Sequence, residues 1–585
     1  MPPESQRRLI HIVLLVAVCL VTFWILDNGP HQVNIHPVMT ATSRPQVVLR
    51  QGKIIGSKLV ESHGGLSHTL DQFLGIPYAL STDGERRFKP AVPVPESELE
   101  FDASKYGQRC PAGEKDSTPM GEDCLNLNLF RPATRPKDGK LPVLVYIHGG
   151  SFNFGAGNAR QISSMVAWST RPMIGISFNY RLGALGFLSS KVAAAEGVLN
   201  LGLKDQDLLL RWVRENVHAF GGDEGDVTIM GSSAGAHSVG HHLLHNPDEP
   251  PLFHKAIIES GAATARTVLP YDNPLLEQQF HDFLSHLGLQ NLPTEKILNS
   301  LRTLPYTLIK SASEQIYAQY ASSLRWPWQP VIEGKGGIIT QAPIQAWKSG
   351  KWHQVPIMTG FNTNEGAIFI DPGISTSDQF TKFFRVLLPN LSTEDLRILN
   401  EIYPDPTTDP SSPYVETRKE LGRQFFRMEQ AYGHFAYISP VRQTAHFAAS
   451  SGSPVWLYQF AATSRREGGA DHCDHNNFVT YNKELREFSP SIREISAKMH
   501  SYWTSFVTTG DPNAEEGLWK ERATWPRFGV GDAAEGKWGK IAVFGEGNDE
   551  IAGGGERGVA VKIVEDGWVR GECGFWEGRT ELFES

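Results

Sequence analysis

One stretch decides the fold of this chain: Val227-Thr228-Ile229-Met230-Gly231-Ser232-Ser233-Ala234-Gly235-Ala236. Its apolar and β-branched beginning predicts a buried strand, and its alanine-rich end predicts a helix. The two glycines allow the strand and the helix to approach closely through a sharp turn. In a turn of this kind the middle serine is held in a strained conformation that exposes its hydroxyl above the sheet. Ser233 is therefore the candidate nucleophile.

Apolar runs and helical patterns alternate on both sides of this stretch. Strands are expected at residues 141–147, 173–180 and 255–261, and a helix with one apolar face at residues 205–219. The first of these runs is fully apolar, as in a parallel sheet that is buried on both faces. Strands that alternate with helices predict an α/β fold, a large and mostly parallel sheet with helices on both faces.

The composition places the chain among globular proteins. It has 585 residues, 40% of them hydrophobic and 20% charged, with a net charge of −9 that favours solubility. The chain has no excess of basic over acidic residues, so we expect no nucleic-acid partner. Length alone would suggest about four domains.

The N-terminus carries a long apolar run. Arg7 and Arg8 precede residues 9–26, and no Ala-X-Ala cleavage pattern follows closely. The run is longer than a signal-peptide core of about 7–15 residues and reaches the lower limit of about 18 for a membrane span. We therefore expect a short cytoplasmic N-terminus (1–8), an uncleaved signal anchor (9–26) and a linker (27–45). The body would be lumenal or extracellular, as in a single-pass type II membrane protein. A cleaved signal peptide and a secreted body are the alternative.

Four cysteines lie in the body of the chain. Cys110 and Cys124 are close in sequence and form the natural disulfide in an oxidising compartment, whereas reduced thiols would be expected in the cytosol. The pairing of Cys473 and Cys573 stays open. The only glycosylation sequon begins at Asn390 and fits the secretory pathway.

A glycine-rich segment follows the strand at 141–147. It reads His148-Gly149-Gly150-Ser151-Phe152, and we call it the glycine loop. Glycines directly after a buried strand leave backbone N–H groups free to face a cavity, as the stabilisation of an oxyanion requires. An ordinary glycine turn is the alternative interpretation.

Further motifs occur in a fixed order along the chain. They are Glu122-Asp123-Cys124-Leu125-Asn126-Leu127-Asn128, Asn179-Tyr180-Arg181-Leu182-Gly183, Gly202-Leu203-Lys204-Asp205-Gln206 and Phe220-Gly221-Gly222-Asp223. With the glycine loop and the serine turn, they resemble the type-B carboxylesterase/lipase family, the cholinesterase-like branch of the α/β-hydrolases. The resemblance covers roughly residues 45–577. It implies a single catalytic domain over residues 46–585 rather than four domains.

The resemblance also implies a catalytic triad. A serine needs a histidine to take its proton and a carboxylate to orient that histidine, and in α/β-hydrolases the chain order is serine, acid, histidine. Glu365 follows the apolar run 355–360 and matches the family's acid. His472, after the apolar run 455–460, matches the family's histidine. His475 lies three residues further on in the same loop, and the choice between the two histidines stays open.

The family's oxyanion donors fall on Gly150, Ser151 and Ala234. The implied reaction is ester hydrolysis through an acyl-enzyme on Ser233, with no cofactor. The cluster from His472 to His475, with Cys473 between them, contains side chains that bind zinc. Residues so close together cannot easily form a tetrahedral site, and no second ligand pair occurs, so no metal is expected.

The substrate is less well defined by the sequence. Cholinesterases have a tryptophan between their first two cysteines and a glutamate beside the nucleophile, whereas residues 111–123 contain no aromatic side chain and Ser232 replaces the glutamate. Choline esters are therefore not expected. Because the same loop is shorter and more polar than a lipase lid, it favours soluble or short-chain esters. The alternatives are a catalytically silent adhesion protein, or a triad enzyme acting on amides or lactones or in acyl transfer. Two residue pairs, Arg181 with Asp205 and Arg87 with Glu122, resemble pairs that form internal ion pairs in the family.

Overall fold

The computed structural model describes residues 44–584, except 114–117, 135–138, 465–467, 530 and 532–538. The predicted N-terminal segment, signal anchor and most of the predicted linker lie outside the described residues. Residues Pro45–Ser585 group into one compact unit. Within the described residues, no helix has the length and apolarity needed to cross a bilayer.

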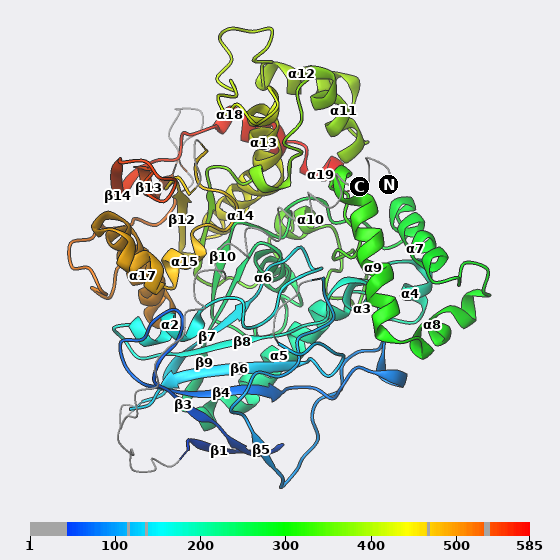
Figure 1. The fold of residues 1–585 in the computed structure, drawn as a ribbon, viewed down its shortest axis with the longest axis vertical. Helices are drawn as coiled ribbons and strands as arrows, with labels where there is room; N and C mark the ends of the chain where they lie inside the picture. The colour runs from blue at the N-terminus through cyan, green and yellow to red at the C-terminus, as the bar shows by residue number, and fades with distance from the viewer. Residues whose placement is uncertain are drawn as a thin grey trace, which may run out of the picture. The chain divides into compact units, whose positions relative to one another are not determined.

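An eleven-stranded mixed sheet runs through this unit (Figure 1). The order is β14-β13-β12-β11-β10-β9-β7-β8-β6-β4-β3, and the strands from β13 through β8 in this order are parallel to one another. The strands are β3 (Ser57–Leu59), β4 (Leu70–Pro77), β6 (Asn126–Pro132), β7 (Leu141–Ile147), β8 (Ile174–Phe178), β9 (Gly222–Ser232), β10 (Lys255–Glu259), β11 (Ile357–Asn362), β12 (Val455–Phe460), β13 (Lys540–Asn548) and β14 (Arg557–Glu565). A second sheet contains β1 (Gln46–Leu49), β2 (Gly52–Ile55) and β5 (Glu100–Asp102).

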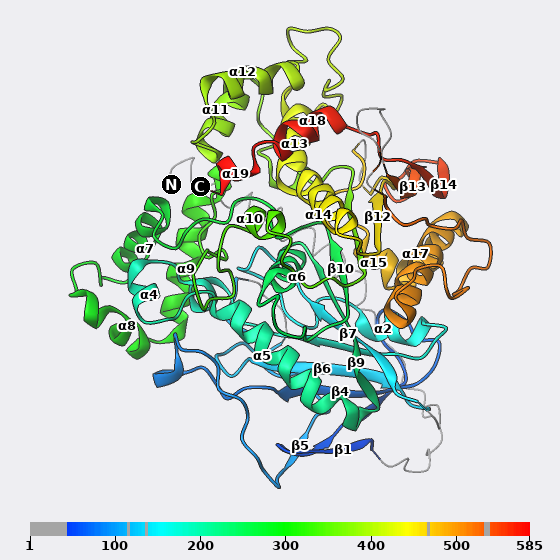
Figure 2. The same cartoon turned by 180° about the vertical axis from the view of Figure 1, so that it is seen from behind.

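Helices cover both faces of the large sheet (Figures 1 and 2). They are α2 (Ile162–Trp168), α3 (Gly183–Phe187), α4 (Lys191–Ala195), α5 (Leu201–Asn216), α6 (Ala234–Leu244), α7 (Pro274–His286), α8 (Thr294–Thr303), α9 (Tyr306–Tyr320), α10 (Pro343–Lys348), α11 (Ser377–Leu387), α12 (Thr393–Ile402), α13 (Phe425–Gly433), the π-helix η5 (His434–Ile438), α14 (Ser439–Ser450), α15 (Asn476–Val479), α16 (Lys483–Phe488), α17 (Pro490–Thr509), α18 (Arg570–Glu577) and α19 (Thr580–Phe583). The expected helix at 205–219 begins earlier, as α5, and gives way to a 3-10 turn at Val217–Phe220.

Successive side chains of a strand point to opposite faces of the sheet. Since helices cover both faces, apolar side chains are needed on each of them. Val143 and Val145 of β7 belong to a cluster with residues of α5, α6 and α14. Leu144 and Tyr146 of the same strand belong to a second cluster, with residues of α2 and α17. This alternation explains why β7 reads as an unbroken apolar run, and it agrees with the predicted α/β-hydrolase fold.

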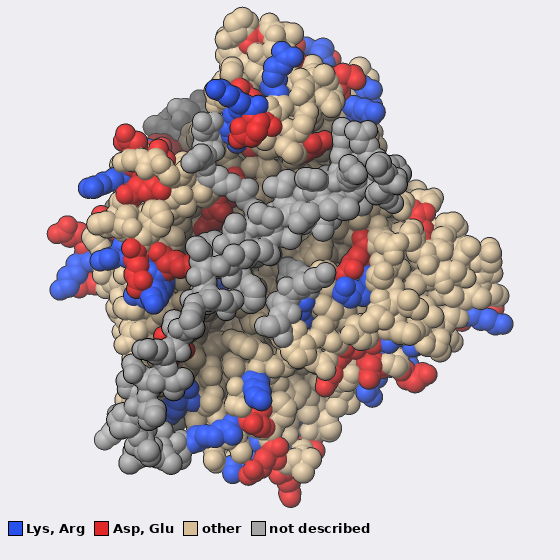
Figure 3. Space-filling model, in the orientation of Figure 1, with Lys and Arg blue, Asp and Glu red and all other residues tan. Residues whose placement is uncertain are grey.

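The disulfide and the two ion pairs expected from the sequence are present. Cys110 and Cys124 form a disulfide. Arg181 pairs with Asp205 at 2.6 Å, and Arg87 pairs with Glu122 at 2.6 Å, all four side chains being buried. Charged side chains at the surface are interspersed in sign on the face shown in Figure 3.

Candidate active site

The serine turn joins β9 to α6. Ser233 lies between them with a φ of 56°, in the left-handed region that non-glycine residues rarely adopt. A Cβ on Gly235 would lie 2.0 Å from the Ile147 carbonyl oxygen, and one on Gly231 would lie 2.2 Å from the Gly235 carbonyl oxygen. The Ser233 N–H donates to the Glu259 carbonyl at 3.0 Å. The two glycines are therefore required by close backbone approach, as predicted.

Three loops bring Ser233, Glu365 and His472 together. His472 Nε2 lies 2.8 Å from Ser233 Oγ, and His472 Nδ1 hydrogen-bonds to Glu365 Oε2. The loops follow β9, β11 and β12, which are near neighbours in the sheet. Glu365 is fully buried, and His472 is 8% exposed. This geometry is that of a nucleophile, a base and an orienting acid.

Asn362 holds the acid and histidine loops in register. Its N–H donates to Glu365 Oε1 at 2.7 Å, and its side-chain amide donates to the Asp471 carbonyl. Its Oδ1 lies 3.0 Å from His475 Nδ1. Reasoning from the sequence missed this residue, although it lies two positions after the predicted strand 355–360 and precedes the acid by three positions.

His475 and His472 have separate surroundings. His475 is fully buried, and its Nε2 lies 3.2 Å from the Tyr458 hydroxyl and 3.8 Å from Glu259 Oε1. Cys473 Sγ lies 3.2 Å from Ser232 Oγ. No group of three or more potential metal-binding side chains occurs in the described part of the chain.

The surroundings of His472 act on its charge in opposite directions. Burial alone lowers the pKa of His472, but the Cys473 sulfur and the Glu365 carboxylate raise it above its usual value. The carboxylate acts by stabilising the imidazolium form. The same stabilisation applies when the ring accepts a proton from Ser233 during an attack on a carbonyl carbon.

The glycine loop lies directly against Ser233 with its carbonyl oxygens turned away. The Gly150 carbonyl accepts from the N–H groups of Asn153 and Phe154 at 2.9 and 2.8 Å. The Ser151 carbonyl accepts from the side-chain amides of Asn153 and Gln329 at 2.8 and 3.0 Å. Gly150 and Ser151 have φ values of 114° and 53°. These hydrogen bonds to its carbonyl groups fix the position of the glycine loop.

The opposite ends of these peptide groups are free to bind a ligand. Among the described residues, the N–H groups of Gly150 and Ser151 donate to no backbone or side-chain acceptor. Ala234 is the first residue of α6, where helical N–H groups have no partner within the helix. These are the three donors assigned from the sequence, and they border the same serine turn.

Aromatic rings line the other side of His472. The rings of Tyr437 and Phe369 lie 4.4 and 5.3 Å from its imidazole. Phe369 also contacts Trp326 at 5.5 Å and Tyr432 at 5.8 Å. We call Trp326, Phe369, Tyr432 and Tyr437 the aromatic wall. Tyr437 belongs to the π-helix η5, and such segments occur frequently at functional sites.

The two remaining cysteines of the described chain form no disulfide, and the asparagine of the sequon is exposed. Cys473 and Cys573 are both free thiols, so they do not pair with each other. Asn390 is exposed, two residues before Ser392, which caps α12.

Comparison with known proteins identifies the family. The profile of the carboxylesterase family matches residues 43–543. The chain is 35% identical to Secreted lipase 4 of Gibberella zeae, over 82% of this chain and 85% of that protein. The chain belongs to the carboxylesterase family. It is 31% identical to acetylcholinesterase of Bungarus fasciatus, over 81% of this chain and 80% of that protein. The crystal structure of EstA from Aspergillus niger superposes with a TM-score of 0.76 at 26% identity, covering 93% of this chain and 99% of that one.

The family resemblance seen in the motifs is therefore confirmed. As a member of the carboxylesterase family with an α/β-hydrolase fold, the protein is a carboxylic ester hydrolase. The family match extends across both the glycine loop and the loops that carry Glu365 and His472.

Proposed function

We propose that this carboxylesterase works through an acyl-enzyme on Ser233. His472 Nε2 takes the proton of Ser233 Oγ while the oxygen attacks the ester carbonyl carbon. The carbonyl oxygen becomes an oxyanion and accepts hydrogen bonds from the N–H groups of Gly150, Ser151 and Ala234. Glu365 keeps the imidazole in the correct tautomer and stabilises its protonated form.

The second half of the reaction uses the same groups. The imidazolium gives its proton to the leaving alkoxide, the C–O bond breaks, and the alcohol departs. Water then loses a proton to His472 and attacks the acyl carbon, and Ser233 recovers its proton as the acid is released. Atoms and charges balance without a cofactor.

One observation carries this proposal: His472 contacts Ser233 Oγ at 2.8 Å through one ring nitrogen and Glu365 through the other. The free N–H groups of the glycine loop support it, because they lie beside the serine turn. A catalytically silent adhesion protein would not need this arrangement. Hydrolysis of amides or lactones would use the same residues, so these alternatives differ from ester hydrolysis only in the substrate.

Fluorophosphonate labelling tests the nucleophile. We expect the native protein to be labelled covalently and Ser233→Ala to remain unlabelled, with a loss of esterase activity of about 10⁴-fold or more. Ser232→Ala is the matched control, because Ser232 is the adjacent serine of the same turn, and it should still be labelled. Labelling of Ser233→Ala at the native rate would contradict the proposal.

A pair of histidine variants tests the base. We expect His472→Ala to lose about 10³- to 10⁴-fold in kcat on a 4-nitrophenyl ester. His475→Ala should keep much more activity, because His475 contacts Asn362 and Tyr458 rather than Ser233. Greater loss in His475→Ala than in His472→Ala, with both variants folded, would overturn the assignment.

We also propose that the body of the protein enters the secretory pathway. The disulfide Cys110–Cys124 supports this, because disulfides persist in oxidising compartments. The similarity to a secreted lipase favours release over anchoring through residues 9–26. Carbonate extraction of expressing cells separates the two forms: secreted protein appears in the medium, whereas anchored protein stays in the membrane pellet. Glycosidase treatment of the same samples reports on glycosylation at Asn390.

The proposed substrates are soluble esters rather than choline esters. In residues 111–113 and 118–123, the described part of the loop between Cys110 and Cys124, no aromatic ring is available to hold a quaternary ammonium. A chain-length series of 4-nitrophenyl esters tests the preference, and we expect kcat/KM to be highest for short acyl chains.

A further inference from the structure

Arg266 is a cation beside the proposed active site that the ester hydrolysis described above does not use. It lies in the segment after β10, the strand whose Glu259 carbonyl accepts from the Ser233 N–H. Its guanidinium lies over the ring of Trp326, 3.7 Å from the ring centroid. Its backbone has a φ of 67°, which is strained for a residue other than glycine. Strained residues of this kind concentrate at functional sites.

The aromatic wall connects Arg266 to His472. Trp326, on which the guanidinium lies, contacts Phe369, and Phe369 contacts the His472 ring at 5.3 Å. Burial raises the pKa of Tyr432, and the positive charge of the nearby Arg266 guanidinium acts against that rise. The positive charge of Arg266 is therefore felt at the wall of the site and not only at the surface.

A second path connects Arg266 to the glycine loop. Burial raises the pKa of Tyr317 to about 12, while the Arg266 charge and a hydrogen bond to the Ser151 side chain both oppose this. Tyr317 also stacks on Trp326, with 5.7 Å between ring centroids. Gln329, three residues after Trp326, donates to the Ser151 carbonyl at 3.0 Å. Arg266 is thus adjacent to groups that touch both the base and the oxyanion donors.

The guanidinium has no carboxylate partner among the residues that the structure describes. Arg266 is half-buried, and no ion pair to it is present there. Most other arginines that pack on aromatic rings have such a partner among the described residues, for example Arg160 with Glu259 and Arg442 with Asp566 at 2.5 Å. Three others have none within the described part of the chain: Arg486, Arg522 and Arg527. A half-buried guanidinium without a carboxylate partner keeps a positive charge that an anionic ligand can neutralise.

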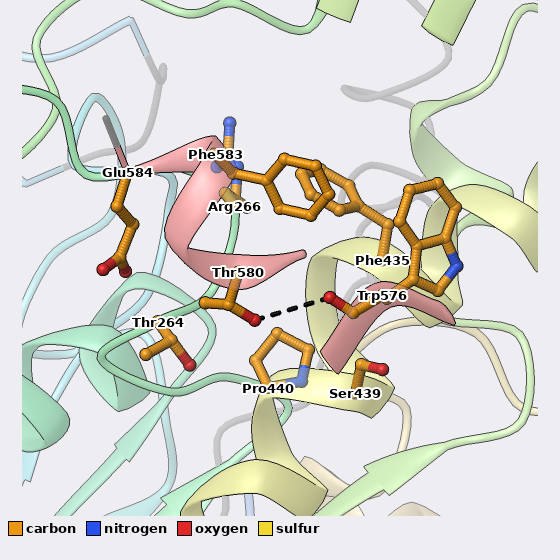
Figure 4. A pocket seen from close by; sticks show the side chains of 9 residues that line it. All are labelled: Thr264, Arg266, Phe435, Ser439, Pro440, Trp576, Thr580, Phe583 and Glu584. Atoms are coloured by element: carbon orange, nitrogen blue, oxygen red, sulfur yellow. Dashed lines mark hydrogen bonds between the residues drawn. The ribbon is translucent and has the colours of Figure 1, made fainter. Parts of the chain in front are cut away.

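Glu584 is the nearest acid to consider. It borders the same small cavity as Arg266, but in Figure 4 its carboxylate points away from the Arg266 guanidinium. Burial raises the pKa of Glu584 to about 8, while the Ile344 N–H opposes that rise. Because Glu584 is largely protonated at neutral pH, it does not neutralise Arg266. The cavity, of about 10 Å³, holds one water molecule at most.

We propose that Arg266, with the hydroxyl groups of Tyr317 and Tyr432, forms an anion subsite beside the triad, so that the enzyme prefers esters that carry a second, ionised carboxylate group. The inference rests on the proposed function and specifies its substrate class: monoesters of dicarboxylic acids, or esters formed at the hydroxyl group of a hydroxy acid, both of which keep a free carboxylate. The covalent steps on Ser233 are unchanged. The free carboxylate of the substrate remains ionised and takes no part in bond breaking.

The chemistry of guanidinium favours this ligand. Its planar N–H donors match the two oxygens of a carboxylate, and one face can stack on an aromatic ring while the edge binds the anion. A charge-assisted hydrogen bond contributes about 10- to 100-fold in binding. If Arg266 served only to cover Trp326, a neutral side chain of similar length would replace it with equal effects on charged and neutral esters.

Matched pairs of substrates test the proposal. For the acyl side, mono-4-nitrophenyl hexanedioate and octanedioate are compared with the same compounds capped as methyl esters. For the alcohol side, 4-acetoxybenzoate is compared with methyl 4-acetoxybenzoate. We expect the native enzyme to favour the anionic member of at least one pair by about 10-fold or more in kcat/KM. The preference should shrink as the salt concentration rises, because screening weakens the attraction.

The variants Arg266→Gln and Arg266→Lys show whether this side chain is responsible. Gln should abolish the preference for the anion while changing kcat/KM for the neutral member by less than about threefold, and Lys should keep part of the preference. Arg397→Gln on α12 is the matched control, because it removes the same charge from an exposed site. It should leave the preference intact.

The outcomes separate this inference from the proposed function. Native enzyme that hydrolyses neutral esters without preferring the anion in either pair overturns the anion subsite alone. Equal losses on both members in Arg266→Gln and Arg266→Lys would mean a structural role and would also overturn it. Absence of fluorophosphonate labelling and of any ester turnover would overturn the proposed function itself.

Discussion

At the scale of single residues, the Cys473 sulfur and the Glu365 carboxylate both raise the pKa of His472. Burial favours the neutral imidazole, and the Glu365 carboxylate favours the charged form. We expect Glu365→Gln to lower kcat/KM by about 10²- to 10⁴-fold, because the amide orients the ring less well and cannot stabilise the imidazolium. Removing the negative charge also lowers the pKa of His472. The acid limb of the kcat/KM profile should therefore move to lower pH, and an unchanged limb would show that Glu365 does not act on the base.

Single residues also mark the limit of sequence reasoning. Ser233 could be predicted from the glycine turn after an apolar strand, and Glu365 from its match to the family's acid in the segment after another such strand. The choice between His472 and His475 stayed open, since both stand among acidic residues in one loop. Only tertiary contacts distinguish them: His472 contacts Ser233 and Glu365. His475 contacts Asn362 instead. Arg266 gave no sequence signal, because a lone arginine in a loop is ordinary until its missing partner is visible.

At the scale of elements, the crossing of β7 and α6 depends on Gly235. A Cβ there would lie 2.0 Å from the Ile147 carbonyl oxygen, which is backbone of a central strand and cannot move independently. We expect Gly235→Ala to lower the free energy of unfolding by several kcal/mol, at the upper end of the usual range for a single substitution. It should also reduce fluorophosphonate labelling, because Ser233 would be displaced. Urea unfolding and labelling rates measure the two effects.

Gly574 in α18 is the matched control for this substitution. No atom lies within 4 Å of the position of its Cβ, so alanine meets no obstacle there. Alanine in a helix interior is favoured over glycine by about 1 kcal/mol, so Gly574→Ala should stabilise the protein slightly. Similar destabilisation by both substitutions would contradict the argument from close approach.

Elements were predictable where both faces of a strand are buried. β7 and β12 have the bounds of the apolar runs read from the sequence, because the sheet needs apolar side chains on each side there. The antiparallel pair β13 and β14 was not recognised. β14 lies at the edge of the sheet and is partly exposed along much of its length, so it lacks a continuous apolar run.

At the scale of the whole molecule, buried histidines couple folding to pH. Burial is the first cause that lowers the pKa of each of five of them, to about 4 or about 3: His148, His241, His242, His434 and His500. In the unfolded chain their pKa returns to about 6.5. Between these values the unfolded state binds more protons than the folded state, so stability falls as the pH falls. Each pKa unit corresponds to about 1.4 kcal/mol per group.

Two buried acids act in the opposite sense, and the balance sets the optimum. Burial raises the pKa of Glu429 and of Glu584 to about 8, so these groups lose stability as the pH rises from about 4.5 towards 8. The five histidines outnumber them below pH 6.5, whereas above it the two acids and His472, whose pKa is also raised, lose stability as the pH rises. We therefore expect the free energy of unfolding to be greatest near pH 6.5 and to fall by several kcal/mol by pH 4.5. Urea unfolding followed by tryptophan fluorescence from pH 4.5 to 8 measures it. Stability that is flat or rises on acidification below pH 6.5 would show that these histidines are not held neutral by the fold.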